Sequence, residues 1–172
     1  SSDGYILTNY HVIEDADRLQ VTADGGEYEA QVVGTDPSSD LAVLKIDATD
    51  LTAIEIGSSS DLTVGEWVMA LGSPYGLEQS VSTGIVSATS RTTTELNSDT
   101  SSAVYTNLIQ TDAAINPGNS GGALVDKDGK LIGVNTLIAS SSGSSSGVGF
   151  AIPVDYAINI AQQIIDGKQP SH

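Results

Sequence analysis

The residues best suited to covalent chemistry surround Ser120, in the run Gly118-Asn119-Ser120-Gly121-Gly122. A serine hydroxyl can attack an acyl carbon, and the oxyanion that forms then needs N–H donors. Glycines allow a loop that exposes the hydroxyl and points two backbone N–H groups at one place, where a β-carbon would obstruct a substrate. We expect Gly118 and Ser120 to be these donors, in an oxyanion hole that spans Gly118, Asn119 and Ser120. Taken alone, the run is equally consistent with a polar turn.

A serine nucleophile needs a general base, and His11 is the candidate. The other histidine, His172, ends the chain in a polar tail and is expected to be exposed and without a catalytic role. His11 follows the strand-like run 5–8. A single histidine beside a strand is more often structural, but His11 gains weight because the chain offers no other credible base for Ser120.

Asp40 is the candidate for the third group, which must orient the imidazole and compensate its charge from a semi-buried position. It stands at the mouth of the apolar run 41–46, where a strand would fix its carboxylate. Asp36 and Asp47 are the comparison residues, and Asp36 precedes a proline in an expected turn. His11, Asp40 and Ser120 follow the chain order of the chymotrypsin triad, which differs from the orders in subtilisin and the α/β-hydrolases. Together they predict acyl transfer by a serine nucleophile.

The composition argues against several other classes of protein. The 172 residues are 39% apolar, which suffices for one domain with a core, and the absence of cysteine excludes disulfides and thiolate metal sites. Six basic against 22 acidic residues give a net charge of −16, which disfavours nucleic acid and anionic membranes as partners. No apolar run approaches the ~20 residues of a transmembrane helix, and no export signal is visible. We expect no metal and no cofactor.

Short β-branched runs separated by Gly, Asp and Ser turns must position these groups. They predict an all-β fold, a barrel or sandwich, with hairpins at 24–26 and 128–129. One helix over 153–167 closes the chain, because apolar residues recur there at three- and four-residue steps and Gly167 follows as a stop. The polar segments 92–102 and 140–147 are expected to be loops. The expected strands are 5–8, 19–23, 27–33, 41–46, 66–71, 81–90, 108–111, 123–126, 130–138 and 149–152.

Stretches along nearly the whole chain resemble the protease domain of the bacterial HtrA (Deg) family, within the chymotrypsin-like fold. The matching stretches are residues 4–13, 40–46, 65–76, 82–88, 110–116, 118–124 and 147–153. The resemblance implies two orthogonal six-stranded β-barrels with the triad between them, roughly 1–72 and 78–153, in a single trypsin-like domain of residues 1–170. It also implies a homotrimer in the bacterial cell envelope, or secreted, that cleaves misfolded or unfolded proteins without ATP.

The residue six positions before Ser120 is Ala114, where trypsin-like enzymes hold the carboxylate of the specificity pocket. Its neighbours in the expected pocket are also largely apolar. We therefore predict a preference for small to medium aliphatic P1 residues over Lys or Arg. The residues expected to line this substrate pocket are Ala114, Ile115, Val134, Thr136 and Ile138.

Further expectations concern regulation and the flanks of the chain. In HtrA proteins an arginine at the position of Arg91 helps a sensor loop to organise the oxyanion loop; a solvated charge at a strand end is the alternative. Pro117 restricts the backbone beside Gly118. The family carries a further N-terminal segment and often a PDZ domain. We expect that the N-terminal segment is truncated here, or lost by cleavage or disorder, which would leave the first barrel incomplete. Membrane contact is expected only through an anchor outside this chain.

Three functions remain open from the sequence. The first is an active serine endopeptidase that works through an acyl-enzyme. The second is a resting or catalytically silent chaperone or peptide-binding module on the same fold. The third is a structural β-barrel in which Ser120 occupies an incidental turn. The complete triad favours the first.

Overall fold

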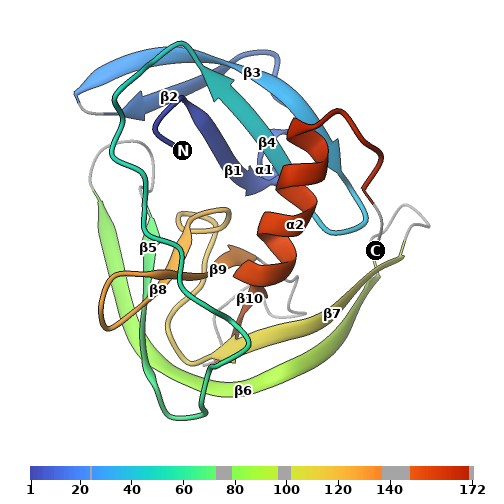
Figure 1. Cartoon of the computed structure of the whole chain (residues 1–172). Coiled ribbons are helices and arrows are strands. Elements are labelled where there is room, and N and C mark those ends of the chain that lie inside the picture. The colour runs from blue at the N-terminus through green and yellow to red at the C-terminus, as the bar shows by residue number, and fades with distance from the viewer. Residues whose placement is uncertain (24, 73–78, 97–101, 137–147, 171–172) are drawn as a thin grey trace. The chain divides into compact units, whose positions relative to one another are not determined.

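The computed structural model describes residues 1–23, 25–72, 79–96, 102–136 and 148–170, with the backbone alone over 91–96 and 102–106. The chain divides into two compact units, one made of Ser1–Ile54 with Ile158–His172 and the other of Glu55–Ala157. Both consist mainly of antiparallel strands (Figure 1). His11 and Asp40 belong to the first unit, and Ser120 belongs to the second.

The first unit is built on a four-stranded antiparallel sheet. Its strands are β1 (Tyr5–Asn9), β2 (Leu19–Ala23), β3 (Gly26–Asp36) and β4 (Leu41–Ile46), in the order β1-β4-β3-β2. The short helix α1 (Tyr10–Ile13) follows β1 directly. The apolar strand β4 is buried at all but one position, as its composition predicts. Asn9 pairs with Leu41 across β1 and β4, and this register brings the start of α1 beside Asp40.

The second unit is a closed six-stranded barrel with the strand order β10-β7-β6-β5-β8-β9. Its strands are β5 (Trp67–Gly72), β6 (Ser80–Leu96), β7 (Ser102–Thr111), β8 (Ala123–Asp126), β9 (Leu131–Thr136) and β10 (Gly149–Pro153). The barrel core is small and aliphatic, and includes Val68, Val86, Ile109, Leu124 and Ile132. Ser120 lies between Thr111 and Ala123, in the connection from β7 to β8.

Helix α2 (Val154–Ile165) confirms the predicted C-terminal helix. At its start, the N–H of Asp155 donates to Ser59 Oγ at 3.1 Å, and the N–H of Ser59 donates back to the Asp155 carboxylate at 3.4 Å. At its end, Gly167 adopts a φ of 73° and donates its N–H to the carbonyl of Ile164. A left-handed glycine after the last turn is a common way for a helix to terminate.

The predicted class, a mostly β chymotrypsin-like fold with a C-terminal helix, is confirmed, but three details differ. The strand expected at 66–71 in the first barrel is β5 of the second unit, because it hydrogen-bonds with β6 and β8. In the described part of the first unit the sheet has four strands and is open, where the resemblance implied six in a barrel. The described residues of the expected loop 92–102 are strand, since β6 and β7 continue to pair as far as Leu96 and Ser102.

Candidate active site

His11 and Asp40 form a close hydrogen-bonded pair in the first unit. Nδ1 of His11 lies 2.6 Å from Oδ2 of Asp40, and the backbone N–H of His11 donates to Oδ1 at 2.8 Å. Both carboxylate oxygens therefore engage one residue. The Asp40 side chain is 5% exposed and that of His11 is 34% exposed, so the imidazole can be reached while its partner is shielded. This geometry fixes the ring and directs Nε2 away from the carboxylate.

The backbone of Asp40 is held in a conformation that non-glycine residues rarely adopt. Its φ is 57°, in the left-handed region. Its carbonyl oxygen accepts hydrogen bonds from Asn9 Nδ2 at 2.9 Å and from the N–H of Tyr10 at 3.0 Å. Asn9 is fully buried. Strained residues that their surroundings fix in this way are typical of functional sites.

The loop around Ser120 is tied to its own unit by backbone hydrogen bonds. The N–H of Gly121 donates to the carbonyl of Asn135 at 2.8 Å, and the N–H of Gly122 donates to the carbonyl of Asn119 at 3.0 Å. Gly121 has a φ of 83°, which a residue with a β-carbon would adopt only with strain. Gly72 lies beneath the loop, where a β-carbon would stand 2.5 Å from Asn119 Cβ. Gly121 therefore needs to be glycine because of its backbone angle. Gly72 needs to be glycine because the loop lies so close to it, which the sequence did not indicate.

Both expected oxyanion donors have partners within the loop. The N–H of Gly118 donates to Asn116 Oδ1 at 2.9 Å, and the N–H of Ser120 donates to the Asn116 carbonyl at 3.1 Å. The N–H of Asn119 donates to the same carbonyl at 3.1 Å. Asn116 thus engages both groups that an oxyanion would need, in a tight helical turn over 116–120.

The side chain of Asn119 braces the loop from within. Its Oδ1 accepts the N–H of Asn116 at 2.9 Å, and its Nδ2 donates to the carbonyl of Ala114 at 2.8 Å. Asn119 is 4% exposed, and Ser120 is half-buried. Within the expected oxyanion hole, Asn119 therefore acts as a support for the chain between Gly118 and Ser120.

The residues expected in the substrate pocket differ in their surroundings. Ala114 is exposed, and its carbonyl also accepts a hydrogen bond from Ser82 Oγ at 2.8 Å. Ile115 is 6% exposed and belongs to the barrel core. Val134 and Thr136 are buried on β9, while Ile138 lies outside the described residues. Arg91 pairs with Leu108 across β6 and β7, and its side chain is outside the described part of the structure.

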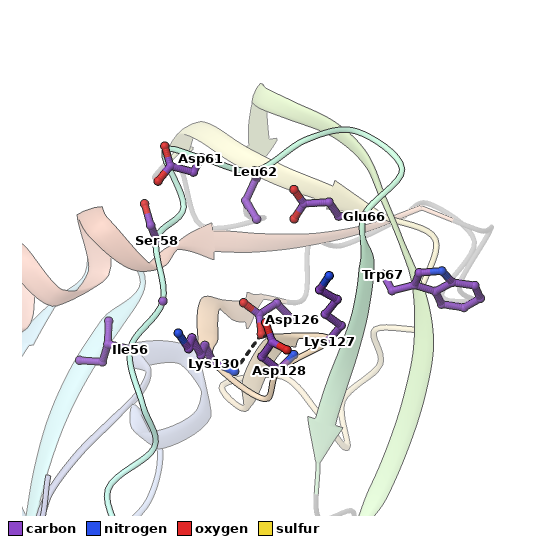
Figure 2. Close-up of a pocket in the computed structure, with 11 residues that line it drawn as sticks. Ile56, Ser58, Asp61, Leu62, Glu66, Trp67, Asp126, Lys127, Asp128 and Lys130 are labelled. Atoms are coloured by element: carbon purple, nitrogen blue, oxygen red, sulfur yellow. Dashed lines mark hydrogen bonds between the residues drawn. The ribbon is translucent and has the colours of Figure 1, made fainter.

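A pocket of about 730 Å³ lies elsewhere on the second unit (Figure 2). None of the expected substrate-pocket residues lines it. Lys130 lies 3.5 Å from Glu55 in an ion pair, and the Asp126 carboxylate accepts the N–H groups of Asp128 and Lys130. Trp67, 68% exposed, points its ring away from the other labelled side chains. These polar groups bond with one another and with the backbone of the turn over 126–130.

Three asparagines shape the site although the sequence did not single them out. Asn9 holds Asp40, Asn116 engages the oxyanion donors, and Asn135 binds the nucleophile loop from β9. Asn9 and Asn116 read as ordinary turn residues, which bond to nearby backbone groups in many loops. Asn135 did carry a signal, because an amide follows directly after the apolar run 131–134.

Among the described residues, no three His, Asp or Glu side chains gather as a metal site. No helix in the described part of the chain has the length and apolar character needed to cross a bilayer.

The chain is similar to known proteins over most of its length. The family model of the trypsin-like peptidase domain matches residues 1–134. A probable periplasmic serine endoprotease, DegP-like, of Halomonas elongata is 52% identical over 165 residues, which cover 95% of this chain and 33% of the relative. A protein of the same description from Pseudomonas putida is 51% identical over 98% of this chain and 34% of its own length. The chain thus spans about a third of these relatives.

Solved structures give the same result. A serine-to-alanine variant of the HtrA-type protease AlgW with a decapeptide superposes with a TM-score of 0.86 at 50% identity, over 98% of this chain and 50% of that one. AlgW with a tripeptide gives a TM-score of 0.85 at 50% identity, over 97% of this chain and 54% of that one. The chain belongs to the trypsin-like peptidase domain family, and the relatives it resembles there are HtrA-type, DegP-like serine endoproteases.

Proposed function

We propose that this chain is a serine endopeptidase in which Ser120 is the nucleophile, His11 the general base and Asp40 the group that orients His11. The observation that carries the proposal is the His11–Asp40 pair, in which a shielded carboxylate on a left-handed backbone engages the imidazole at 2.6 Å. The glycine-bounded loop of Ser120 supports it from the second unit. The relatives are named serine endoproteases, which agrees with this chemistry.

Each residue has one task in the proposed reaction. Because Nδ1 of His11 faces the Asp40 carboxylate, the ring proton sits on Nδ1 and Nε2 is the basic nitrogen. Nε2 takes the proton of the Ser120 hydroxyl as Oγ attacks the carbonyl carbon of the scissile peptide bond. The resulting imidazolium, stabilised by Asp40, returns that proton to the leaving amine as the C–N bond breaks. Water then hydrolyses the acyl-enzyme by the same steps and restores the Ser120 hydroxyl.

The oxyanion would be bound by the N–H groups of Gly118 and Ser120, which requires their release from Asn116. Donors of this kind contribute roughly 100- to 1,000-fold each to the rate of acyl transfer. A chain whose donors stay engaged would therefore bind a peptide without cleaving it efficiently. This observation favours the second candidate function, a resting or silent peptide-binding module, as the alternative to an active enzyme.

The substrates proposed are unfolded or misfolded polypeptides, cleaved after small to medium aliphatic residues. The named relatives with a decapeptide and a tripeptide support peptide binding. A panel of peptides that differ only at P1 tests the preference. Cleavage after Ala, Val or Ile is expected, whereas efficient cleavage only after Arg would contradict it.

The proposed assembly is a homotrimer outside the cytoplasm. The location follows the description of the relatives as periplasmic. Exposed apolar side chains on the second unit, with Trp67 at 68% and Val64 at 59%, give such an assembly surface to bury. Sedimentation equilibrium should give three times the chain mass of 17.6 kDa, and replacement of Trp67 by serine should lower it. A monomer at all concentrations would refute the assembly.

Labelling with a fluorophosphonate tests the proposed chemistry, since the probe forms a covalent bond with an activated serine. The unaltered chain should be labelled, Ser120→Ala should not, and His11→Ala should be labelled much more slowly. A chain that binds unfolded peptide but never reacts would support the peptide-binding module instead. Labelling that persists in Ser120→Ala would place the nucleophile elsewhere.

A further inference from the structure

Asn135 is a buried polar residue in a strand that is otherwise suited to the barrel core. It lies on β9 with no exposed surface, next to the buried Val134 and Thr136. Its side-chain Oδ1 has no hydrogen-bond partner among the described residues. A buried acceptor without a partner destabilises the fold, so an apolar side chain of the same size would suit the barrel better. The asparagine therefore calls for another explanation.

The backbone and the side chain of Asn135 both hydrogen-bond with the segment around Ser120. Its N–H donates to the carbonyl of Gly122 at 2.9 Å, and its carbonyl accepts the N–H of Gly121 at 2.8 Å. Its side-chain Nδ2 donates to the carbonyls of Asn119 at 3.3 Å and of Ala123 at 3.1 Å. One residue thus holds the chain on both sides of Ser120.

The bond to the Asn119 carbonyl has a consequence for Ser120. The peptide group between the two residues is planar and trans, so its C=O and N–H point in opposite directions. An amide that holds the Asn119 carbonyl toward β9 therefore directs the Ser120 N–H to the other side. That N–H is one of the two donors assigned to the oxyanion.

We propose that Asn135 is a positioning residue for the nucleophile loop, which orients the Ser120 N–H by holding the Asn119–Ser120 peptide group through Nδ2. The inference rests on the proposed function. Asn135 holds residues 119–123, whereas the hydrogen bonds described for Asn116 and Gly118 lie within the loop, and Gly72 packs against the carbonyl of Gly118. The N–H of Gly122 also donates to the Asn119 carbonyl, so removing Nδ2 loosens the peptide group without releasing it.

The test compares Asn135→Leu and Asn135→Asp with the unaltered chain. Leucine keeps the branched shape of the side chain, with bulkier methyl groups, and removes both side-chain N–H donors. Aspartate keeps the size and sets an oxygen against the two carbonyls. We expect kcat for a fluorogenic peptide to fall roughly 10- to 100-fold, with KM changed less than about threefold, because a small misplacement of reacting groups costs about that much. Fluorophosphonate labelling should slow in parallel, and the amide NMR signal of Ser120 should shift.

Ile132 provides the matched control, since it is 1% exposed, lies on the same strand and contacts the barrel core instead of the loop. Ile132→Val should lower Tm slightly and Ile132→Ala should lower it more, so that the two span the Tm loss of the Asn135 variants. Each assay is run well below the Tm of every variant. The proposal is overturned if the Asn135 variants keep their kcat, or lose no more of it than an Ile132 variant of equal Tm. If the unaltered chain itself is not labelled, the proposed function fails, and the positioning role fails with it.

Discussion

Replacing Asp40 by asparagine probes the most specific contact of the site. In the structure Oδ1 of Asp40 accepts the backbone N–H of His11 at 2.8 Å, while Oδ2 faces His11 Nδ1 at 2.6 Å. An asparagine has one oxygen, and the backbone N–H requires it at the Oδ1 position, because two donors would otherwise face each other. In the Asp40→Asn variant, the NH₂ group of the new side chain then points at Nδ1.

The consequence is a change of tautomer. Nδ1 becomes an acceptor, so the ring proton moves to Nε2, which can no longer take the proton of Ser120. The imidazolium also loses its compensating charge. A wrong tautomer in a triad of this kind costs about 10⁴-fold in kcat, or roughly 5.5 kcal/mol at 1.36 kcal/mol per factor of ten. We expect a loss of that order in the cleavage of a fluorogenic peptide.

Asp36 is the matched control for this prediction. It is 5% exposed, ends β3 shortly before Asp40, and accepts hydrogen bonds from Ser38 and Ser39. Asp36→Asn should lower Tm but keep kcat within about threefold, because its carboxylate accepts the hydroxyls of Ser38 and Ser39 and is not the group assigned to orient His11. If Asp40→Asn retains more than about a tenth of the parental kcat, or if Asp36→Asn loses as much, the assigned roles are wrong.

Three further changes test the loop and the fold. Asn116→Ala removes the Oδ1 that engages the Gly118 N–H. The rate of fluorophosphonate labelling should rise by about 2- to 10-fold, since one hydrogen bond contributes roughly 1 kcal/mol. An unchanged rate would refute the role of Asn116, and Asn159→Ala on the exposed face of α2 is the control. Gly72→Ala should displace Asn119, slow the labelling, and lower the free energy of unfolding by about 1–3 kcal/mol. Gly65→Ala, with no atom within 4 Å of its new β-carbon, should keep its labelling rate. Gly167→Ala should cost about 1 kcal/mol in chemical denaturation because of the φ of 73°, and equal stability would contradict that assignment.

The pair of His11 and Asp40 could be predicted because each stands at the end of a strand-like run, and β1 and β4 do pair there. The left-handed φ of Asp40 and the help of Asn9 could not, since they depend on a contact between residues 31 positions apart. Likewise, glycines around Ser120 indicate a tight loop. The bonds from the Gly118 N–H to the Asn116 side chain and from the Ser120 N–H to the Asn116 carbonyl could not be predicted, because they depend on how the turn folds.

Strand partners were harder to predict than strands. The run that became β5 was recognised, yet its membership of the second unit depends on hydrogen bonds to β6 and β8 that only the assembled barrel specifies. The segment 92–96 reads as a loop because it is polar, but threonine favours the extended backbone and its strand finds a partner in 102–105. Asn135 shows the opposite case, a polar residue inside an apolar strand whose role appears only when its partners are known.

We propose that the His11–Asp40 pair of the first unit serves Ser120 of the second. A crystal structure of the chain with a peptidyl boronic acid tests it directly. We expect a bond from Ser120 Oγ to boron, His11 Nε2 within about 3.2 Å of Oγ, and a boronate oxygen about 2.7–3.1 Å from the N–H groups of Gly118 and Ser120, with Gly118 released from Asn116. A boronate bound without a bond to Ser120, or a bonded Ser120 with His11 out of hydrogen-bonding reach, would contradict the account.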